Sequence, residues 1–317
     1  MQIFGGKSQI HGLPSVSVAL GFFDGVHLGH RVLIERSISY ARKTGNAAAV
    51  FTFRDHPKNV ISGTTCVKRL LSEADRNKIF ESLGIDYVFE FDFADGFHEM
   101  SPDAFAGDLL CNTFGASAVF CGYNFRFGAL ARGDADTLRA LGVLYGFEVD
   151  VVDRVEVGGQ PVSSTRIRAL IEKGKVCEAN RLLGEDFRLS GTVLHGNARG
   201  RTIGFPTANF KPDPVMVWPS YGVYATTVSV PGTDKPLPAV TNFGTRPTVG
   251  GKETLAETHI FGYTDDLYGK EIVVTFCRHL REEKKFDTFE ALKQQIEKDK
   301  AAAGANLIVC PPSGSKP

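Results

Sequence analysis

The sequence predicts an α/β protein in two parts: an N-terminal doubly wound parallel sheet, and a small C-terminal β-barrel closed by a helix. A length of 317 residues is enough for two ordinary domains. Over the first half, apolar strand-like runs alternate with helical patterns, which is typical of a parallel sheet. From Phe187 onward, short strand-like runs are separated by Gly/Pro turns, which favours a small barrel. We place the boundary near Gly184–Phe187, which gives domains 1–184 and 185–317.

Five apolar runs in the first half predict strands, and helical patterns lie between them. One helix begins at the capping box Ser72–Asp75 and ends at Gly84. The predicted strands cover residues 16–20, 48–53, 87–93, 118–121 and 147–152. Further helices are predicted over residues 102–113, 165–173 and 176–183.

The second half is predicted to hold several short strands followed by one helix. Its turns include Pro231-Gly232, residues 244–247 and Gly250-Gly251. The predicted strands cover residues 191–194, 221–230, 239–243, 258–261 and 271–277, and the helix covers residues 288–300. The tail after residue 300 is expected to be frayed.

Composition excludes several classes of protein. The formal net charge is zero, so a general polyanion-binding protein is not supported. No segment approaches the roughly 18 apolar residues of a membrane span, and no signal peptide is recognised. The six cysteines are scattered without a C-x-x-C pair, which disfavours structural zinc and a disulfide framework. We therefore expect a cytoplasmic protein that binds neither nucleic acid nor membranes.

The stretch GFFDGVHLGH, Gly21–His30, directly follows the first predicted strand. In a doubly wound sheet, ligands bind beyond the carboxyl ends of the strands. The glycines allow a tight turn and close approach to a ligand. If a helix begins near His27, then His27 and His30 can both face a phosphate group bound near its positive end. A capped surface turn with incidental histidines, or a metal site, would also give H-x-x-H.

The full string resembles the G-x-F-D-G-x-H-x-G-H signature of the HxGH nucleotidyltransferase superfamily. A second string, Ser163–Arg168 (SSTRIR), resembles the [ST]-S-T-x-[IV]-R element of the same superfamily. By itself it also suits a capped helix start with an arginine one turn on. The resemblance implies catalytic roles for His27 and His30. It also implies that ATP phosphates are bound by Gly21, Phe23, Asp24, Ser163, Ser164, Thr165 and Arg168.

Two further segments resemble the flavin-adenylylating branch of that superfamily. FTFRDHPKNV, residues 51–60, resembles T-F-x-P-H-P, with Asp55 where proline is usual. GYNFRFG, residues 122–128, resembles G-[ED]-[ND]-F-R-F-G, with Tyr123 at an often acidic position. The resemblance implies a flavin site built from Asn124, Phe125, Arg126 and Phe127. Core packing is the alternative role for the two phenylalanines.

A second candidate site lies in Gly191–Phe210, GTVLHGNARGRTIGFPTANF. Its spaced glycines suit a loop that brings phosphates near the backbone, although a Gly-rich hairpin would look the same. Thr207 and Asn209 offer the hard oxygen ligands that Mg²⁺ prefers. The phosphate-binding residues expected here are Gly196, Gly200, Gly204 and Thr207, and the metal ligands are Thr207 and Asn209.

This segment resembles the G-x-x-x-x-G-x-x-x-G-x-P-T-A-N signature of riboflavin kinases. Glu257 falls where that family has its catalytic base, and Glu253 is a nearby carboxylate without such a role. Together the resemblances cover residues 16–299. They imply riboflavin, FMN and ATP as substrates, Mg²⁺ with ATP, and no prosthetic group. The expected products are FMN from the C-terminal domain and FAD from the N-terminal domain.

Two other functions fit parts of this pattern. One is a riboflavin kinase whose nucleotidyltransferase domain is weak or has another acceptor, for which Asp55 and Tyr123 are the hints. The other is a flavin-binding protein without turnover, which would not need an apparent base, metal ligands and two phosphate loops. The sequence leaves self-association open.

Overall fold

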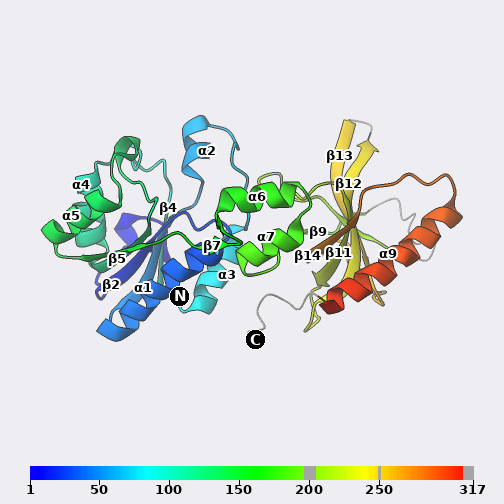
Figure 1. Cartoon of the computed structure of the whole chain (residues 1–317), viewed down its shortest axis with the longest axis horizontal. Helices are drawn as coiled ribbons and strands as arrows, with labels where there is room; N and C mark the ends of the chain where they lie inside the picture. The colour runs from blue at the N-terminus through cyan, green and yellow to red at the C-terminus, as the bar shows by residue number, and fades with distance from the viewer. Residues whose placement is uncertain (196–204, 249–250, 310–317) are drawn as a thin grey trace. The chain divides into compact units, whose positions relative to one another are not determined.

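The structure is a computed structural model that describes residues 1–195, 205–248 and 251–309. The three glycines Gly196, Gly200 and Gly204 of the second signature lie outside the described residues. The chain divides into two compact units, Met1–Ser163 and a second that begins at Ser164 (Figure 1).

The described residues of the first unit form a six-stranded sheet in the order β1-β4-β3-β2-β5-β6. Every pairing in this sheet is parallel. Its strands are β1 (Gln2–Phe4), β2 (Val16–Leu20), β3 (Ala47–Phe53), β4 (Tyr87–Phe91), β5 (Ala116–Gly122) and β6 (Glu148–Val152). The chain adds β3 and β4 on one side of β2, and β5 and β6 on the other. The winding therefore reverses at β2, and such a switch point is where open α/β sheets bind ligands.

Helices cover both faces of this sheet (Figure 1). Successive residues of β2 point to opposite faces, so Val18 and Leu20 enter one hydrophobic core while Ala19 enters the other. The helical segments are η1 (Lys7–Gln9), α1 (Leu28–Thr44), α2 (Pro57–Ser62), α3 (Glu73–Leu83), α4 (Pro102–Ala104), the π-helical η2 (Phe105–Thr113), η3 (Ala129–Ala131) and α5 (Ala135–Tyr145). A hairpin of β7 (Glu156–Val157) and β8 (Gln160–Pro161) follows the sheet. The predicted doubly wound architecture is confirmed.

The second unit begins with two helices and continues into an antiparallel barrel. Its sheet has the order β10-β13-β12-β11-β14-β9 over the residues described. The two edge strands approach each other through a bridge between Leu194 and Asn209, which nearly closes the barrel. The elements are α6 (Ser164–Glu172), α7 (Val176–Leu183), β9 (Arg188–Thr192), β10 (Ala208–Phe210), β11 (Gly222–Ser229), β12 (Leu237–Thr248), β13 (Gly251–Ile260), β14 (Glu271–Arg281) and α9 (Phe289–Val309).

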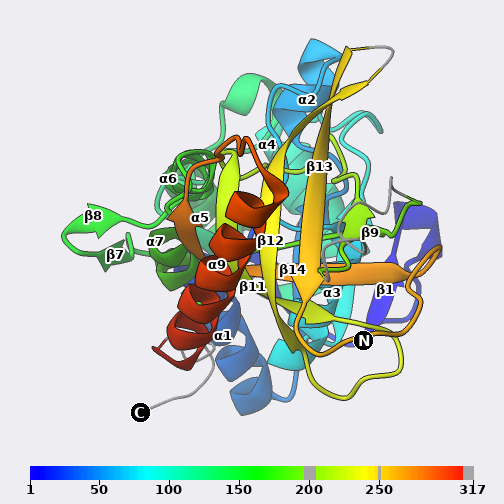
Figure 2. The same ribbon diagram turned by 90° about the vertical axis from the view of Figure 1, so that its right-hand side faces the viewer.

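Helix α9 lies along the barrel, beside β11 and β12 (Figure 2). Ala303 of α9 is buried against Val223, Ala225 and Val240 of the sheet. The predicted barrel closed by a helix is therefore confirmed. The helix continues to Val309, whereas the sequence predicted an end near residue 300 and a frayed tail.

One sequence prediction within the barrel is wrong. Residues 244–247 were expected to form a turn between strands, yet β12 runs through them to Thr248. The pairing with β11 stops at Phe243, while the ladder with β13 continues through Gly244 opposite Leu255. Beyond Phe243 the strand is therefore paired on one side only, and Pro247 is tolerated there because proline is accepted in edge strands.

The compact units divide at a different place from the predicted boundary at 184/185. Helices α6 and α7 pack with the barrel: Asn180 Nδ2 donates to the Phe276 carbonyl at 2.9 Å, and the Cys177 thiol donates to the Cys277 carbonyl at 3.0 Å. Residues 164–183 thus belong to the second unit by packing. Position 184/185 stays a prediction of where the two activities divide.

Candidate active sites

The first candidate site is the loop that leaves β2 at the switch point of the parallel sheet. This loop is Gly21–His27, and α1 follows it at Leu28. The free N–H groups in the first turn of α1 make this end of the helix favourable for an anion. The loop that follows β5 begins at the same edge, because β5 is the neighbour of β2. The sheet thus brings together the signature loop and the predicted flavin segment.

The backbone of the signature loop is unusual. Phe23 has a φ of +52° and Val26 a φ of +37°. Residues other than glycine rarely adopt this backbone conformation. A Cβ atom at Gly21 would lie 3.0 Å from the Phe23 ring, which explains the glycine there. Such strain persists only where the surroundings enforce it, and it is concentrated at functional sites.

His27 and His30 form a stacked pair with ring centroids 3.6 Å apart. His27 is the N-cap of α1, and its Nδ1 accepts the N–H of His30 at 3.3 Å. In a neutral His27 ring the proton is therefore on Nε2.

His30 is held in its neutral form. The residue as a whole is half-buried, and its Nδ1 is buried and, among the described residues, has no hydrogen-bond partner. Burial, and next the charge of His27, lowers the pKa of His30 well below its ordinary value of 6.5. His30 is thus suited to act as a neutral hydrogen-bond donor to phosphate oxygens.

Asp24 and Phe23 are turned away from solvent. Asp24 Oδ1 accepts the backbone N–H groups of Leu70 at 2.8 Å and Leu71 at 3.4 Å, so its carboxylate anchors the loop. The Phe23 ring is fully buried and packs edge-on against His30 and Phe80. These two residues shape the loop, and Phe23 has no exposed side-chain surface for a nucleotide.

The segment after β3 contributes a residue that the sequence analysis did not assign. His56 caps α2, accepting the N–H of Lys58 on Nδ1 at 3.2 Å, and its ring lies edge-on 4.8 Å from Phe22. Its signal in the sequence is the His-Pro pair, because proline is favoured at the first helical position. Asp55, at the usual proline position, forms an ion pair with Arg69.

The predicted flavin residues differ in exposure. Asn124 and Arg126 are exposed, Phe125 is half-buried, and Phe127 is part of the hydrophobic core. The rings of Phe125 and Phe127 stack with centroids 5.7 Å apart. Arg126 forms an ion pair with Asp134. Phe127 therefore supports Phe125 from the core side, and Phe125 keeps the more accessible ring.

The second superfamily string falls at the start of the second unit. Ser163 is the last residue of the first unit, and α6 begins at Ser164. Ile167 is buried, whereas Thr165 is exposed and Arg168 half-buried. The predicted helix start with an arginine one turn on is thus present in the second unit, and its capping by Ser163–Thr165 stays a prediction.

The second candidate site is a row of polar side chains across three barrel strands. Asn209 of β10, Glu257 of β13 and Asn242 of β12 are directly opposite one another in the ladder. Cross-strand neighbours of this kind project from the same face of the sheet. The Oδ1 atom of Asn209 is buried and has no hydrogen-bond partner within the described part of the chain. Thr207, two residues earlier, is half-buried.

Glu257 is part of an alternating set of charges on this face. It forms an ion pair with Arg246, and Glu253 forms one with Lys211. Glu283, which the sequence analysis did not single out, accepts from Asn242 Nδ2 at 3.2 Å. Its only sequence signal is a charged stretch, which is usually just solvated surface.

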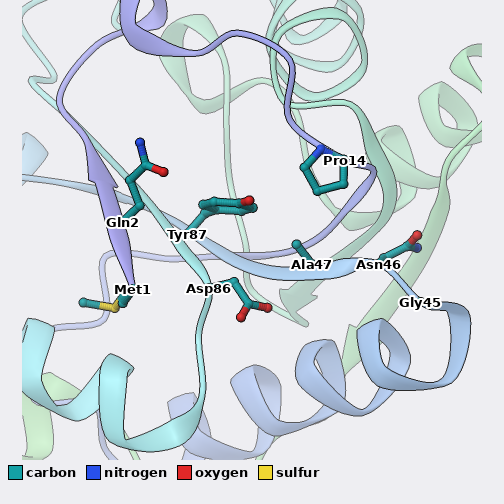
Figure 3. A pocket seen from close by; sticks show the side chains of 8 residues that line it. All are labelled: Met1, Gln2, Pro14, Gly45, Asn46, Ala47, Asp86 and Tyr87. Carbon is teal, nitrogen blue, oxygen red and sulfur yellow. The ribbon is translucent and has the colours of Figure 1, made fainter.

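The cavity in Figure 3 has a volume of about 610 Å³ and lies at the opposite edge of the parallel sheet. Its lining includes the amino ends of β1, β3 and β4 at Gln2, Ala47 and Tyr87. Asp86, also in the lining, accepts the N–H of Ala48 at 2.9 Å and thereby serves the fold. Ligands of parallel sheets bind at the carboxyl ends, so we assign no role to this cavity.

Comparisons with known proteins match both parts of the chain. A family model described as FAD synthetase matches residues 10–166, and one described as riboflavin kinase matches residues 183–307. The "Bifunctional riboflavin kinase/FMN adenylyltransferase" of Escherichia coli (strain K12) is 37% identical over 286 residues, covering 90% of this chain and 91% of the relative. The protein of the same name from Haemophilus influenzae is 35% identical over 293 residues, covering 92% and 94%.

A solved structure is also similar to this chain. The "Macrolide-efflux Protein from Streptococcus pneumoniae" aligns with a TM-score of 0.87 and 31% identity, covering 95% of this chain and 98% of that one. That title speaks of the other chain, and both matching family models are named for flavin enzymes. Across the described residues, none of the helices has both the length and the apolar character needed to cross a membrane.

The two models match in chain order, and the relatives align over about nine-tenths of the sequence, as both predicted resemblances required. The chain belongs to the family of bifunctional riboflavin kinase/FMN adenylyltransferases.

Proposed function

We propose that this chain converts riboflavin into FAD in two steps, at two separate sites, with one ATP consumed in each. The barrel phosphorylates riboflavin to FMN, and the parallel-sheet unit transfers the adenylyl group of a second ATP to FMN. The observation that carries the proposal is the presence, in one chain, of a stacked histidine pair with a neutral His30 at a sheet switch point and an amide–carboxylate row across a barrel. It favours two activities over a kinase with an idle second domain, and over a carrier without turnover.

In the adenylyl transfer, an FMN phosphate oxygen forms a bond to the α-phosphorus of ATP while pyrophosphate leaves. The attacking oxygen is already anionic, so no protein base is needed. His27 and His30 donate hydrogen bonds to oxygens that gain charge, and the first turn of α1 adds its free N–H groups. Gly21, Phe23 and Asp24 give the loop its shape. The family resemblance assigns phosphate binding to the hydroxyls of Ser163, Ser164 and Thr165 and to the guanidinium of Arg168.

The flavin acceptor is proposed to bind at the loop after β5. The Phe125 ring, backed by Phe127, offers a stacking surface, and Asn124 and Arg126 offer exposed polar groups. Arg126 can exchange its exposed partner Asp134 for a phosphate at little cost, because surface ion pairs contribute about 1 kcal/mol or less.

In the kinase step, the 5′-hydroxyl oxygen of riboflavin bonds to the γ-phosphorus of ATP while ADP leaves. Glu257 accepts the hydroxyl proton on its carboxylate, and Arg246 beside it holds that carboxylate in place. Thr207 and Asn209 fit a magnesium ion, because both offer hard oxygen atoms and Asn209 Oδ1 is left without a protein partner in the described residues. A bound Mg²⁺ would neutralise charge on the ATP phosphates.

The proposal also assigns substrates and setting. Riboflavin, FMN and ATP are the small-molecule partners, with Mg²⁺ required and no prosthetic group. A cytoplasmic location and any self-association rest on the sequence alone.

Product chromatography after incubation with riboflavin, ATP and Mg²⁺ tests the proposal. Wild type is expected to give FAD, His30→Ala to stop at FMN, and Glu257→Gln to leave riboflavin unchanged. Removal of one charge-stabilising donor is expected to slow turnover by about a hundredfold. Glu257→Gln supplied with FMN should still make FAD.

The matched controls are Glu253→Gln on the same barrel face and His98→Ala on the surface of the first unit. Both are expected to make FAD at the wild-type rate. FMN without FAD from wild type would refute the adenylyltransferase half of the proposal, and unchanged riboflavin would refute all of it.

A further inference from the structure

A buried ion pair lies directly beneath the signature loop, outside every motif. Arg76 of α3 is 5% exposed and pairs through Nη2 with Glu90 of β4, which is 1% exposed. Burial lowers the pKa of Arg76 and raises that of Glu90, and the charge of each partner opposes the shift of the other. Well-packed apolar residues stabilise a core at least as well as such a pair, so stability alone does not explain it.

The second arm of the Arg76 guanidinium joins two loop-bearing strands. Nη1 donates to the carbonyls of Phe22, in the signature loop, and Phe53, at the end of β3, both at 3.3 Å. Thr52 reinforces the link by donating from Oγ1 to the Phe22 carbonyl at 3.0 Å. Arg76 thus bridges the carboxyl ends of β2 and β3, which precede α1 and α2.

The contact at Phe22 is one of three along the same loop. Phe80, one turn after Arg76 on α3, packs edge-on against Phe23 with centroids 5.8 Å apart. The N–H groups of Leu70 and Leu71, just before α3, are bound by Asp24. Three successive signature residues are therefore held by the segment 70–80. Phe23 in turn contacts His30 at a centroid distance of 5.3 Å.

We infer that Arg76, fixed by Glu90, is a positioning residue for adenylyl transfer: it sets the Phe22 carbonyl, and through Phe23 the place of His30. This inference rests on the proposed function of the first unit. Loss of the arginine frees the loop at the point where it departs from ordinary backbone geometry. A displacement of about 1 Å at such a site can cost a hundredfold in rate.

The test compares Arg76→Met, Arg76→Lys and the double variant Arg76→Met/Glu90→Met in the full chain. FAD formation from FMN and MgATP gives kcat and KM, and thermal unfolding gives Tm. Riboflavin kinase activity gives the concentration of chains whose second unit is intact. Arg76→Met is expected to lower Tm, because Glu90 is left charged and buried. It is expected to lower kcat about 10- to 100-fold, with KM for ATP changed less than threefold.

The double variant separates positioning from stability. It is expected to regain most of the lost Tm while kcat stays low, because the guanidinium that joins the Phe22 and Phe53 carbonyls is gone and the remaining Thr52 hydroxyl donates to Phe22 without holding Phe53. Arg76→Lys keeps a charged donor and is expected to recover at least a third of the wild-type kcat. Arg42→Met, which removes a surface arginine paired with Asp86, is the matched control and should leave kcat unchanged.

The inference is overturned if kcat in the double variant recovers together with Tm, or if folded Arg76→Met retains wild-type kcat. If Arg76→Met fails to fold, the double variant and Arg76→Lys decide. Amide hydrogen exchange over residues 22–30, relative to β5, gives a readout independent of activity. If wild type makes no FAD, the proposed function fails, whereas faster exchange of this loop in the double variant still supports the positioning role.

Discussion

Replacing His30 with asparagine should make the first unit less sensitive to acid. In the folded chain His30 is neutral, because burial and the charge of His27 lower its pKa well below 6.5. In the unfolded chain the same imidazole takes up a proton near pH 6.5. Below that pH the unfolded state therefore binds more protons than the folded state. The stability that His30 confers is present above pH 6.5 and is lost as the pH falls toward its folded-state pKa.

The magnitude follows from the linkage relation. While the folded His30 stays neutral, each pH unit below 6.5 removes about 1.4 kcal/mol from the free energy of unfolding. Between pH 7.5 and pH 5.5 the contribution of this one histidine falls by about 1.4 kcal/mol. For a unit the size of Met1–Ser163 this corresponds to a loss of about 3 to 6 °C in Tm.

Scanning calorimetry of wild type and His30→Asn at both pH values measures this difference. Trp218 is the only tryptophan in the sequence and lies in the second unit. An unfolding transition that leaves the Trp218 fluorescence unchanged is therefore assigned to the first unit. The Tm difference between the two pH values should shrink by about 3 to 6 °C in His30→Asn. It should not change in His98→Asn, whose imidazole is exposed. An equal acid shift in wild type and His30→Asn would show that His30 is not held neutral by the fold.

Three substitutions and the removal of Mg²⁺ test further features of the two units. Asp24→Ala leaves two backbone N–H groups without their acceptor, and calorimetry should show a loss of about 1 to 3 kcal/mol in the first unit with kinase activity intact. Gly191→Ala places a Cβ atom 2.4 Å from the ring of Phe210, so urea unfolding of the second unit should show a loss of about 1 to 3 kcal/mol. Asn209→Ala should raise the Mg²⁺ concentration for half-maximal kinase rate by about tenfold, and chelation of Mg²⁺ should abolish both activities.

The layers of the fold were predictable because their signals are local. The helix capped at Ser72 ends at Gly84 as predicted, since the serine hydroxyl accepts the N–H of Asp75 and Gly84 adopts a φ of +91°. Strand β1 was missed, because its three residues give no periodicity and its pairing with β4 crosses more than eighty positions of sequence. The run through Pro247 was missed because proline marks turns unless one side of the strand is unpaired.

Sequence motifs predicted which residues belong to the candidate sites, but they did not predict the contacts between those residues. His27 and His30 fall together because three residues separate them at a helix start. Arg246 and Glu257 lie eleven positions apart in sequence, and their ion pair depends on the β12–β13 register, which no local pattern supplies. Arg76 and Glu90 likewise carry no motif, since their importance comes from which carbonyls the folded sheet places around them.

The first signature contains two kinds of residue that its letters do not distinguish. His27 and His30 are the residues proposed to donate to the phosphates, whereas Phe23 is wholly buried and the Asp24 carboxylate accepts backbone N–H groups. The two kinds have different reasons for their residue type: the proposed role of the histidines is to bind the charge that develops on phosphate, and the others hold a strained loop in place. A string match therefore points to a candidate site, and the contacts distinguish the proposed roles. Arg76 has the same kind of role as Asp24. Its proposed effect on the chemistry passes through the backbone that carries the histidines.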